Sequence, residues 1–542
     1  MFAVDDEPAS VDVLPHNAAF ATWKTRLGEL GGSIQAYLAA VETLRESTLA
    51  LASPGHDSPF VDALYHEIDA NLSKIKSMEA QMCIGRTALQ SMRNQSRVLA
   101  PINRLPVEIL SRIFSMSIEE EKDSVKCRSP GQTNFVDTPP QVCRYWRDVA
   151  FHTSSLWTHI TLHESMPHHR TRAELSLKRS KRLPLHISVE FMSEGDAPWL
   201  NDVVDLLLPH ISRCVSLKIV VNGVVQLEHL LRALMGHRPP LQMKSITWTN
   251  KLPTDSPLLY DGSYDAMQGA EHLSLTGVAF GWGDLTCAGL LSLTISDFVT
   301  ACHSSWGPPD HFEDLLRGCP MLEYLELGGH GLGHEYVDGW EGMGHAAESS
   351  IFLGHLRTLK LTCVQSYVVH HIAFVLAAPN LDTVTLTEVG PLTRTAGFEE
   401  DACNAFNALQ AILLSFKTSL LSLSLRAINI PHFGRGDEDL ESLPRLENLT
   451  ISLVEMEWDD HDDLLYELLS NQFCPNLRCL TIMDCPTLLF SSEHIDLLTK
   501  RRFNMGNPIQ RLAVRHCGDL QGRQPELLVQ LRERVTEFEY VA

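Results

Sequence analysis

The sequence lacks any long apolar segment. It has 542 residues and is 44% hydrophobic, yet no uninterrupted run approaches the ~18 residues that a membrane-spanning helix needs. The first residues, Met1–Glu7, are acidic and contain no hydrophobic core of the secretory kind. We therefore expect a soluble chain of about two to four domains, located in the cytoplasm and/or the nucleus, with no membrane partner.

Positive charge is also scarce. The chain has 44 Lys and Arg residues against 67 Asp and Glu residues, which gives a formal net charge of −23. Phosphate backbones and anionic lipids repel such a surface, so nucleic acid and membranes are poor partners for the protein as a whole. A basic partner would be attracted to it.

The sequence also lacks closely spaced pairs of cysteines. There are 13 cysteines, an odd number, and they are scattered from Cys83 to Cys517 without one Cys-x-x-Cys pair. This distribution favours a reducing compartment, in which the thiols pack as small hydrophobic side chains.

Motifs for catalysis and cofactor binding are absent as well. The sequence has no phosphate-binding Gly-x-x-x-x-Gly-Lys-Ser/Thr and no Gly-x-Ser-x-Gly. Gly329–Gly333 does not match the dinucleotide spacing, and His330 and His334, four residues apart, lie in a stretch too rich in glycine for a zinc-binding helix. We expect no enzymatic activity, no catalytic residue, no metal and no cofactor.

The N-terminal region divides into a disordered tail, residues 1–16, and a helical region, residues 17–100. The pattern from Ala18 to about Leu51 is helical, with an expected interruption at Gly31-Gly32. The stretch Ser53–Pro59 is rich in proline, glycine and serine and predicts a break.

A second helix of about 35 residues follows, because one apolar series repeats every seven residues. Its members are Val61, Ile68, Ile75, Met82 and Leu89. The companion series is interrupted by Asn71, Glu79, Gly85 and Arg86. This helix could pair within the chain or dimerise weakly, so we expect a possible coiled coil and at most weak self-association.

Residues 101–162 contain a dense group of apolar anchors. Pro106 suits the first turn of a helix, where a missing N–H has no consequence. The helix after it carries a wide apolar face but is only about three turns long, so it must bury that face against later residues or another protein. The anchors are Leu105, Pro106, Ile109, Leu110, Ile113, Phe114, Val142, Cys143, Trp146, Leu156 and Trp157.

In order and type, these anchors resemble an F-box, most closely the version abundant in mushroom-forming fungi. The resemblance covers about residues 101–162 and implies a small all-α domain that docks on the Skp-type adaptor of a cullin ubiquitin ligase. The eleven anchors would then be adaptor-binding residues. One departure is the long, charged segment Ser117–Pro140, where many F-boxes carry a leucine-rich helix.

Residues 163–200 are expected to link this domain to the next. Arg170–Ser180 predicts a basic helix, and Lys178–Arg182 is either a nuclear localisation patch or a solvated helix end, where cations are favourable. Leu183–Phe191 alternates between apolar and polar residues and predicts the first strand of the following domain.

From about residue 201 to residue 542 the chain repeats the unit apolar-x-x-apolar-x-apolar, with successive starts 20 to 39 residues apart. The units are Cys214/Leu217/Ile219, Met243/Ile246/Trp248, Ala270/Leu273/Leu275, Leu290/Leu293/Ile295, Leu322/Leu325/Leu327, Leu356/Leu359/Leu361, Leu381/Val384/Leu386, Leu420/Leu423/Leu425, Leu446/Leu449/Ile451, Leu477/Leu480/Ile482 and Ile509/Leu512/Val514.

The last two apolar residues of a unit alternate on a short strand, and helical segments such as Phe312–Leu316 lie between strands. One unit cannot bury its own apolar face, so the units must stack. The pattern resembles leucine-rich repeats, which implies an α/β solenoid with a parallel sheet on its concave side. Insertions at Gly328–His334 and Thr393–Cys403 are candidate binding loops.

The favoured interpretation is a substrate-receptor subunit of a Skp–cullin–F-box ubiquitin ligase, whose solenoid binds the protein to be modified. This is what the two resemblances imply. The alternatives are a scaffold that acts outside any ligase, and an enzyme with an active site that the sequence does not reveal. The identity of the substrate cannot be obtained from the sequence.

Overall fold

The computed structural model describes the chain over residues 14–51, 59–95, 101–123, 138–166, 168–193, 198–236, 243–251, 267–278, 287–296, 309–329, 350–364, 366–389, 405–430, 442–452, 455–456, 474–484, 492–517 and 525–541. The chain divides into two compact units, Met1–Leu99 and Ala100–Ala542. Residues 1–13 of the expected disordered tail lie outside the described residues, and the expectation is wrong for residues 14–16, which begin helix α1. His330, His334 and most of the two candidate binding loops also lie outside the described residues.

The first unit contains two long helices, α1 (Leu14–Leu51) and α2 (Pro59–Gln95). The predicted break between them is consistent with these bounds, and α2 confirms the predicted helix of about 35 residues. The predicted interruption at Gly31-Gly32 is wrong, because α1 continues through both glycines. A glycine inside a helix is less stable than alanine by only about 0.5–1 kcal/mol, so the flanking turns can continue the helix across it.

The second unit begins with short helices. They are η1 (Pro101–Arg104), α3 (Val107–Asp123), α4 (Pro139–Val142), α5 (Arg144–His152) and η4 (Ser154–Trp157). Proline occupies the first position of α4, where it fits a helix start. The middle of the charged segment 117–140 lies outside the described residues.

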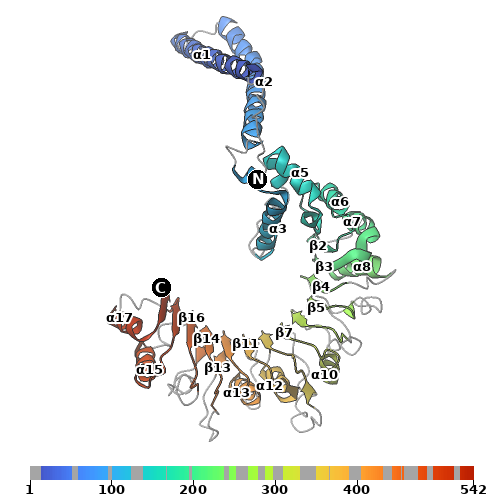
Figure 1. Ribbon diagram of the computed structural model, residues 1–542, viewed down its shortest axis with the longest axis vertical. Coiled ribbons are helices and arrows are strands. Elements are labelled where there is room, and N and C mark those ends of the chain that lie inside the picture. The colour runs from blue at the N-terminus through green and yellow to red at the C-terminus, as the bar shows by residue number, and fades with distance from the viewer. Residues whose placement is uncertain are drawn as a thin grey trace, which may run out of the picture. The chain divides into compact units, whose positions relative to one another are not determined.

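A parallel sheet of 14 strands follows, and each strand pairs with the next one along the chain (Figure 1). Its strands are β1 (His159–His163), β2 (Leu185–Phe191), β3 (Cys214–Val221), β4 (Ser245–Asn250), β5 (His272–Thr276), β6 (Ser292–Ser296), β7 (Tyr324–Gly328), β9 (Thr358–Thr362), β11 (Thr383–Thr387), β12 (Ser422–Arg426), β14 (Asn448–Ser452), β16 (Cys479–Met483), β17 (Arg511–Arg515) and β18 (Glu537–Val541).

The sheet starts earlier than predicted. We expected residues 101–162 to be all-α and Leu183–Phe191 to supply the first strand, but β1 begins at His159 and pairs with β2. Both expectations are wrong at this boundary. Ile160 and Leu162 alternate with polar residues, which is the period of a strand with one buried face.

Helices lie between the strands, and in Figure 1 the labelled ones α10, α12, α13 and α15 are on the outer side of the arc that the strands follow. The helices are α6 (His169–Arg179), α7 (Pro198–Leu207), η5 (Leu208–Arg213), α8 (Val224–Met235), α10 (Pro309–Arg317), α12 (Ser366–Val375), α13 (Ala405–Phe416), α15 (Ser492–Asn504) and α17 (Pro525–Arg534). Two short parallel pairs, β8 (Ile351–Phe352) with β10 (Leu376–Ala377) and β13 (Asn429–Ile430) with β15 (Glu455–Met456), complete the described elements.

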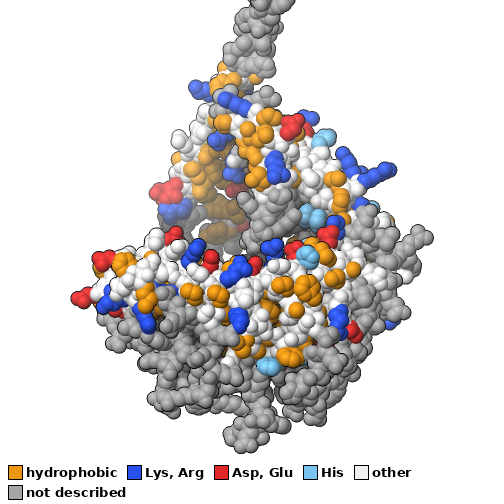
Figure 2. All heavy atoms as spheres, turned by 60° about the horizontal axis from the view of Figure 1, so that its bottom comes forward, with side chains coloured by type: hydrophobic (Ala, Val, Ile, Leu, Met, Phe, Trp, Pro, Cys, Tyr) orange, Lys and Arg blue, Asp and Glu red, His pale blue; other side chains and the backbone are white. Residues whose placement is uncertain are grey.

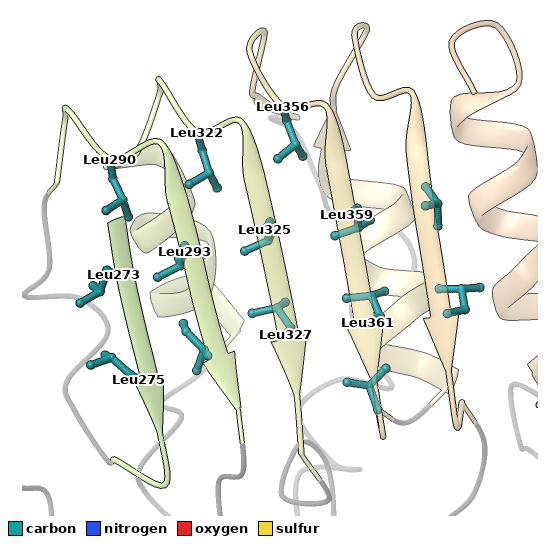
Figure 3. Close-up of a cluster of buried hydrophobic side chains, with 14 of the residues drawn as sticks. Leu273, Leu275, Leu290, Leu293, Leu322, Leu325, Leu327, Leu356, Leu359 and Leu361 are labelled. Atoms are coloured by element: carbon teal, nitrogen blue, oxygen red, sulfur yellow. The ribbon is translucent and has the colours of Figure 1, made fainter. Parts of the chain in front are cut away.

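The core consists of the repeated apolar positions. All three apolar residues of each of the eleven predicted units are buried, which confirms that these positions form the core. Equivalent positions align from strand to strand, so that Leu325 is level with Leu293 on one side and Leu359 on the other. Figure 3 shows the resulting stacks of leucines. Each unit therefore buries its face only against its neighbours.

Five of the described strands are followed by a non-glycine residue in the left-handed region. Cys363, Glu388, Ala427, Asp484 and His516 have φ values from 46° to 54°. Each donates its backbone N–H to the carbonyl of the last residue of the next strand, at 2.8–3.0 Å. This turn returns the chain to the core, where the next residue is buried in four of the five cases: Val364, Val389, Ile428 and Cys517. Cys517 is thus one of the thiols that pack as small hydrophobic side chains.

Candidate functional site

Helix α3 has two neighbouring apolar faces, one of which is buried in the domain while the other is exposed. Leu110 and Phe114, one turn apart, are 0% and 1% exposed, and they pack in a small cluster with residues of α5 and η4. Ile109 and Ile113, also one turn apart, are 50% and 37% exposed. The first pair therefore holds the helical domain together, and the second pair remains available on its surface.

The eleven predicted anchors separate in the same way. Five are buried within the domain, and three are half-buried. The remaining three are exposed. In that order, the groups are Leu110, Phe114, Cys143, Leu156 and Trp157; Leu105, Val142 and Trp146; and Pro106, Ile109 and Ile113.

The exposed apolar surface of this domain is wider than the predicted one. Ile102, Val107 and Met116 are also large exposed hydrophobic residues, on η1 and α3. Met116 lies seven residues after Ile109 and so shares a helix face with Ile109 and Ile113. None of the three was predicted from the sequence as an adaptor-binding residue, although the spacing of Met116 was a usable signal.

Trp146 joins α5 to the beginning of the domain. Its ring lies 5.1 Å from that of Phe114, centroid to centroid, and its indole N–H donates to Oδ1 of buried Asn103 at 2.9 Å. The hydroxyl of Tyr145 donates to the carbonyl of Leu105 at 3.1 Å. These contacts fix η1 and the start of α3 against α5, which holds the exposed face in one orientation.

Two further contacts stabilise the ends of α5. The Sγ atom of Cys143 accepts a hydrogen bond from the backbone N–H of Trp146 at 3.4 Å, so this cysteine acts as the N-cap of the helix. The indole N–H of buried Trp157 donates to the carbonyl of Ala150 at 2.8 Å. Both residues are thus structural members of the domain.

The side chain of Arg179 connects this domain to the part of the chain that forms the sheet. The guanidinium of Arg179, in the last turn of α6, lies 3.7 Å from the ring centroid of Phe151 and 4.4 Å from that of Trp157. Burial lowers the pKa of this guanidinium from its ordinary value. Part of the basic run that resembled a nuclear localisation patch is therefore engaged in packing on aromatic rings.

From β3 to β18, the open face of the sheet carries one aligned row of side chains, one from each strand, between the two positions that face the core. Seven of its twelve members are serine or threonine, and the charged members are two lysines and two glutamates. The row is Lys218, Thr247, Ser274, Thr294, Glu326, Lys360, Thr385, Ser424, Thr450, Thr481, Ala513 and Glu539.

Some of these charges are paired along the row. Glu326 forms an ion pair with Lys360 on the next strand and accepts a hydrogen bond from the hydroxyl of Tyr324 at 2.7 Å. Burial and the nearby carboxylate raise the pKa of Tyr324, so its hydroxyl stays protonated. In the view of Figure 2, acidic and basic side chains are likewise intermixed on the surface. This face offers hydrogen-bonding groups rather than a strong field of one sign.

No group of three or more His, Cys, Asp or Glu side chains in the described part of the chain could hold a metal ion. None of the helices in the described ranges is both long enough and apolar enough to cross a bilayer.

Comparison with known proteins identifies one domain. A family model described as F-box-like matches residues 102–163, the segment that contains η1, α3 and the helices up to β1. No curated protein matches the chain. Residues 102–163 are therefore an F-box-like domain, which supports an F-box protein and indicates a role in substrate recognition by Skp–cullin–F-box-type ubiquitin ligases through a Skp-type adaptor.

Proposed function

We propose that the chain is the substrate-receptor subunit of a Skp–cullin–F-box ubiquitin ligase, and that it performs no bond chemistry itself. The observation that carries this proposal is the exposed apolar face of α3 inside the F-box-like domain. Contiguous exposed apolar surface marks interaction sites on soluble proteins. The receptor would act by holding a substrate close to the ligase, which raises its effective concentration.

The adaptor surface consists, in this proposal, of six exposed apolar residues of the domain and two half-buried ones, Leu105 and Val142, rather than of all eleven anchors. Buried residues such as Phe114 and Trp157 would act by keeping the domain folded. The proposed contact residues are Ile102, Leu105, Pro106, Val107, Ile109, Ile113, Met116 and Val142.

The sheet is, in this proposal, a leucine-rich-repeat solenoid spanning residues 201–542 and extended at its start by β1 and β2. Support comes from the sequential pairing of strands, the aligned buried leucines and the repeated left-handed turn after the strands. The protein substrate would bind the open face of the sheet, where Lys360, Glu326 and the row of hydroxyl groups are available for hydrogen bonds.

The test is a double substitution on the exposed face, Ile109→Asp with Ile113→Asp. Because both side chains are exposed in the free protein, the domain should stay folded. Two charged carboxylates at an apolar contact should weaken adaptor binding at least tenfold, equivalent to about 1.4 kcal/mol, as measured by calorimetry with a purified Skp-type adaptor.

The matched control is Leu414→Asp with Val529→Asp, which introduces the same two charges at exposed aliphatic residues of α13 and α17. It should bind the adaptor like the parent. Circular dichroism should give parental spectra for both proteins. If the Ile109/Ile113 variant is folded and binds the adaptor as tightly as the parent, the ligase-receptor proposal fails.

The second candidate function is a scaffold for protein interactions outside any ligase. It shares the solenoid but requires no cullin. Purification of the tagged protein from its own cells distinguishes the two, because a ligase receptor brings down a cullin in a manner that depends on Ile109 and Ile113. Substrate trapped by the adaptor-deficient variant would identify the modified protein.

A further inference from the structure

Helix α1 carries an apolar series that follows a seven-residue repeat without a gap. Counted in heptads, one position is occupied by Phe20, Leu27, Ile34 and Val41, and the companion position by Trp23, Leu30, Tyr37 and Leu44. We call these eight residues the α1 seam. Four unbroken heptads with apolar residues at both positions are the pattern of a coiled coil.

The α1 seam is uncovered in the single chain. Its eight side chains are between 37% and 62% exposed, and three of them are aromatic. The seam spans 25 residues, or about 37 Å at the helical rise of 1.5 Å per residue. Solvent-exposed aromatic and aliphatic residues in one straight line are the arrangement by which two helices associate, and Trp and Tyr contribute strongly to such contacts.

The neighbouring helix α2 is a poor partner for this seam. Its series has apolar residues at Val61 and every seventh residue after it, but the companion positions include Asn71 and Gly85. An antiparallel hairpin that aligns the two series also places Lys24 beside Arg86 and Arg93. Although α2 follows α1 after only seven residues, it leaves the α1 seam exposed.

A second copy of the chain, in contrast, offers a seam of the same length with no gaps. In a parallel, in-register pair each residue meets its own counterpart, so Ile34 and Val41 occupy the positions where β-branched residues favour two strands. The residues on either side of the seam then pair between the two copies as Arg26 with Gly31, Ser33 with Leu38, and Ala40 with Arg45. None of these pairs brings like charges together. The antiparallel pair would place Lys24 against Arg45.

The two arginines at these flanking positions are already neutralised on their own helix. Arg26 forms an ion pair with Glu29, and Arg45 forms one with Glu42. Both pairs lie outside the seam, so they can persist when two helices associate. We infer that the protein forms a parallel dimer through the α1 seam, with a second copy of this chain as the occupant.

The test uses the full chain in sedimentation equilibrium. The parent should sediment as a dimer, twice the chain mass of 60.6 kDa. Ile34→Asp puts a charge at the centre of the seam and should weaken dimerisation at least 100-fold. Because Ile34 is exposed in the single chain, the variant should retain its helix content by circular dichroism.

The matched control is Ala39→Asp, which places the same charge on the opposite face of α1 and should leave the dimer intact. The parallel arrangement is tested with Thr48→Cys, one heptad beyond Val41, in a Cys83→Ser background that removes an exposed thiol. Oxidation should produce a disulfide-linked dimer. A monomeric parent at about 10 μM, an Ile34→Asp variant that remains dimeric, or failure of the Thr48→Cys dimer to cross-link would overturn the inference.

Discussion

Asn103 joins the first element of the F-box-like domain, η1, to α5. It is buried, and its side-chain oxygen accepts the hydrogen bond of the Trp146 indole at 2.9 Å. A buried donor that loses its acceptor retains the full penalty of leaving water. Loss of this contact should therefore lower the free energy of unfolding by more than the net contribution of one hydrogen bond.

Replacing Asn103 with Ala should lower the free energy of unfolding of this domain by about 1–3 kcal/mol, because the indole N–H is then unpaired. Denaturant unfolding followed by tryptophan fluorescence measures the change. The double variant Asn103→Leu with Trp146→Phe removes donor and acceptor together and should recover part of the loss. A single variant as stable as the parent would show that the hydrogen bond contributes nothing.

Five described cysteines are buried in the repeat core, and four of them have raised pKa values. Burial raises the pKa of Cys214, Cys287 and Cys474 to about 12 and that of Cys319 to about 11. A thiol must be ionised and accessible to react. At pH 8, iodoacetamide should therefore label exposed Cys83 in the native protein and leave these four unlabelled until denaturant is added, as peptide mass spectrometry would show.

The same shifts predict a loss of stability at alkaline pH. The unfolded chain releases these thiol protons near its ordinary pKa of 9.0, while the folded chain retains them up to about 11–12. In this window the folded state binds more protons, so the free energy of unfolding falls as pH rises. Equal stability at pH 8.5 and pH 11 would contradict this assignment of the shifts.

The sequence could identify most of the residues of the site but not the role of each. Ile109 and Leu110 are adjacent and equally apolar, yet one is exposed and the other is buried. Which face of α3 turns inward depends on where α5 and η4 pack, and that is a tertiary property. Asn103 and Tyr145 carried no signal, because single polar residues among apolar ones are common in loops as well as in cores.

At the scale of elements, the left-handed turn after the strands is a recurring conformation that the residues themselves do not always favour. Ala427, which follows β12, has a φ of 46°, a region in which a Cβ is unfavourable and glycine is not. The turn persists because its N–H bonds to Ser452 on the next strand and because Ile428 is then buried.

Ala427→Gly should therefore be neutral or should raise the free energy of unfolding by up to about 1 kcal/mol, because it removes the strain at positive φ. The matched control is Ala411→Gly inside α13, where the same substitution should lower stability by about 0.5–1 kcal/mol. Chemical denaturation of both variants provides the comparison. Destabilisation at both positions by similar amounts would exclude this account of the turn.

The repeat register was predictable because it depends on a short local pattern that recurs many times. The elements that the sequence analysis missed are those that occur once. β18 has charged residues at Glu537 and Glu539, and β1 begins two residues after Trp157 of the helical domain. The α1 seam could not be predicted once an interruption was expected at Gly31-Gly32, because an interruption there divides the heptads into two short series.

At the scale of the whole molecule, the two compact units have different means of stabilisation. Residues 100–542 bury a large apolar core along the sheet and a smaller one in the F-box-like domain, whereas α1 and α2 leave most of their large apolar side chains exposed. In the proposed receptor, the first unit associates two chains and the second contacts the adaptor and the substrate. Two receptors joined in this way would bind a bivalent substrate more tightly than either one alone.

The pairing of each strand with the next one in the chain has a consequence for biosynthesis. A strand needs only the strand before it as a template, so the sheet can grow while the ribosome is still producing the rest of the protein. β1 is reached soon after the helical domain is complete, and its position beside that domain provides the first surface on which β2 can form. Each further repeat then requires closure of a loop of a few tens of residues rather than of the whole chain. A protein of this length can thus fold from its N-terminal side without waiting for its last residue.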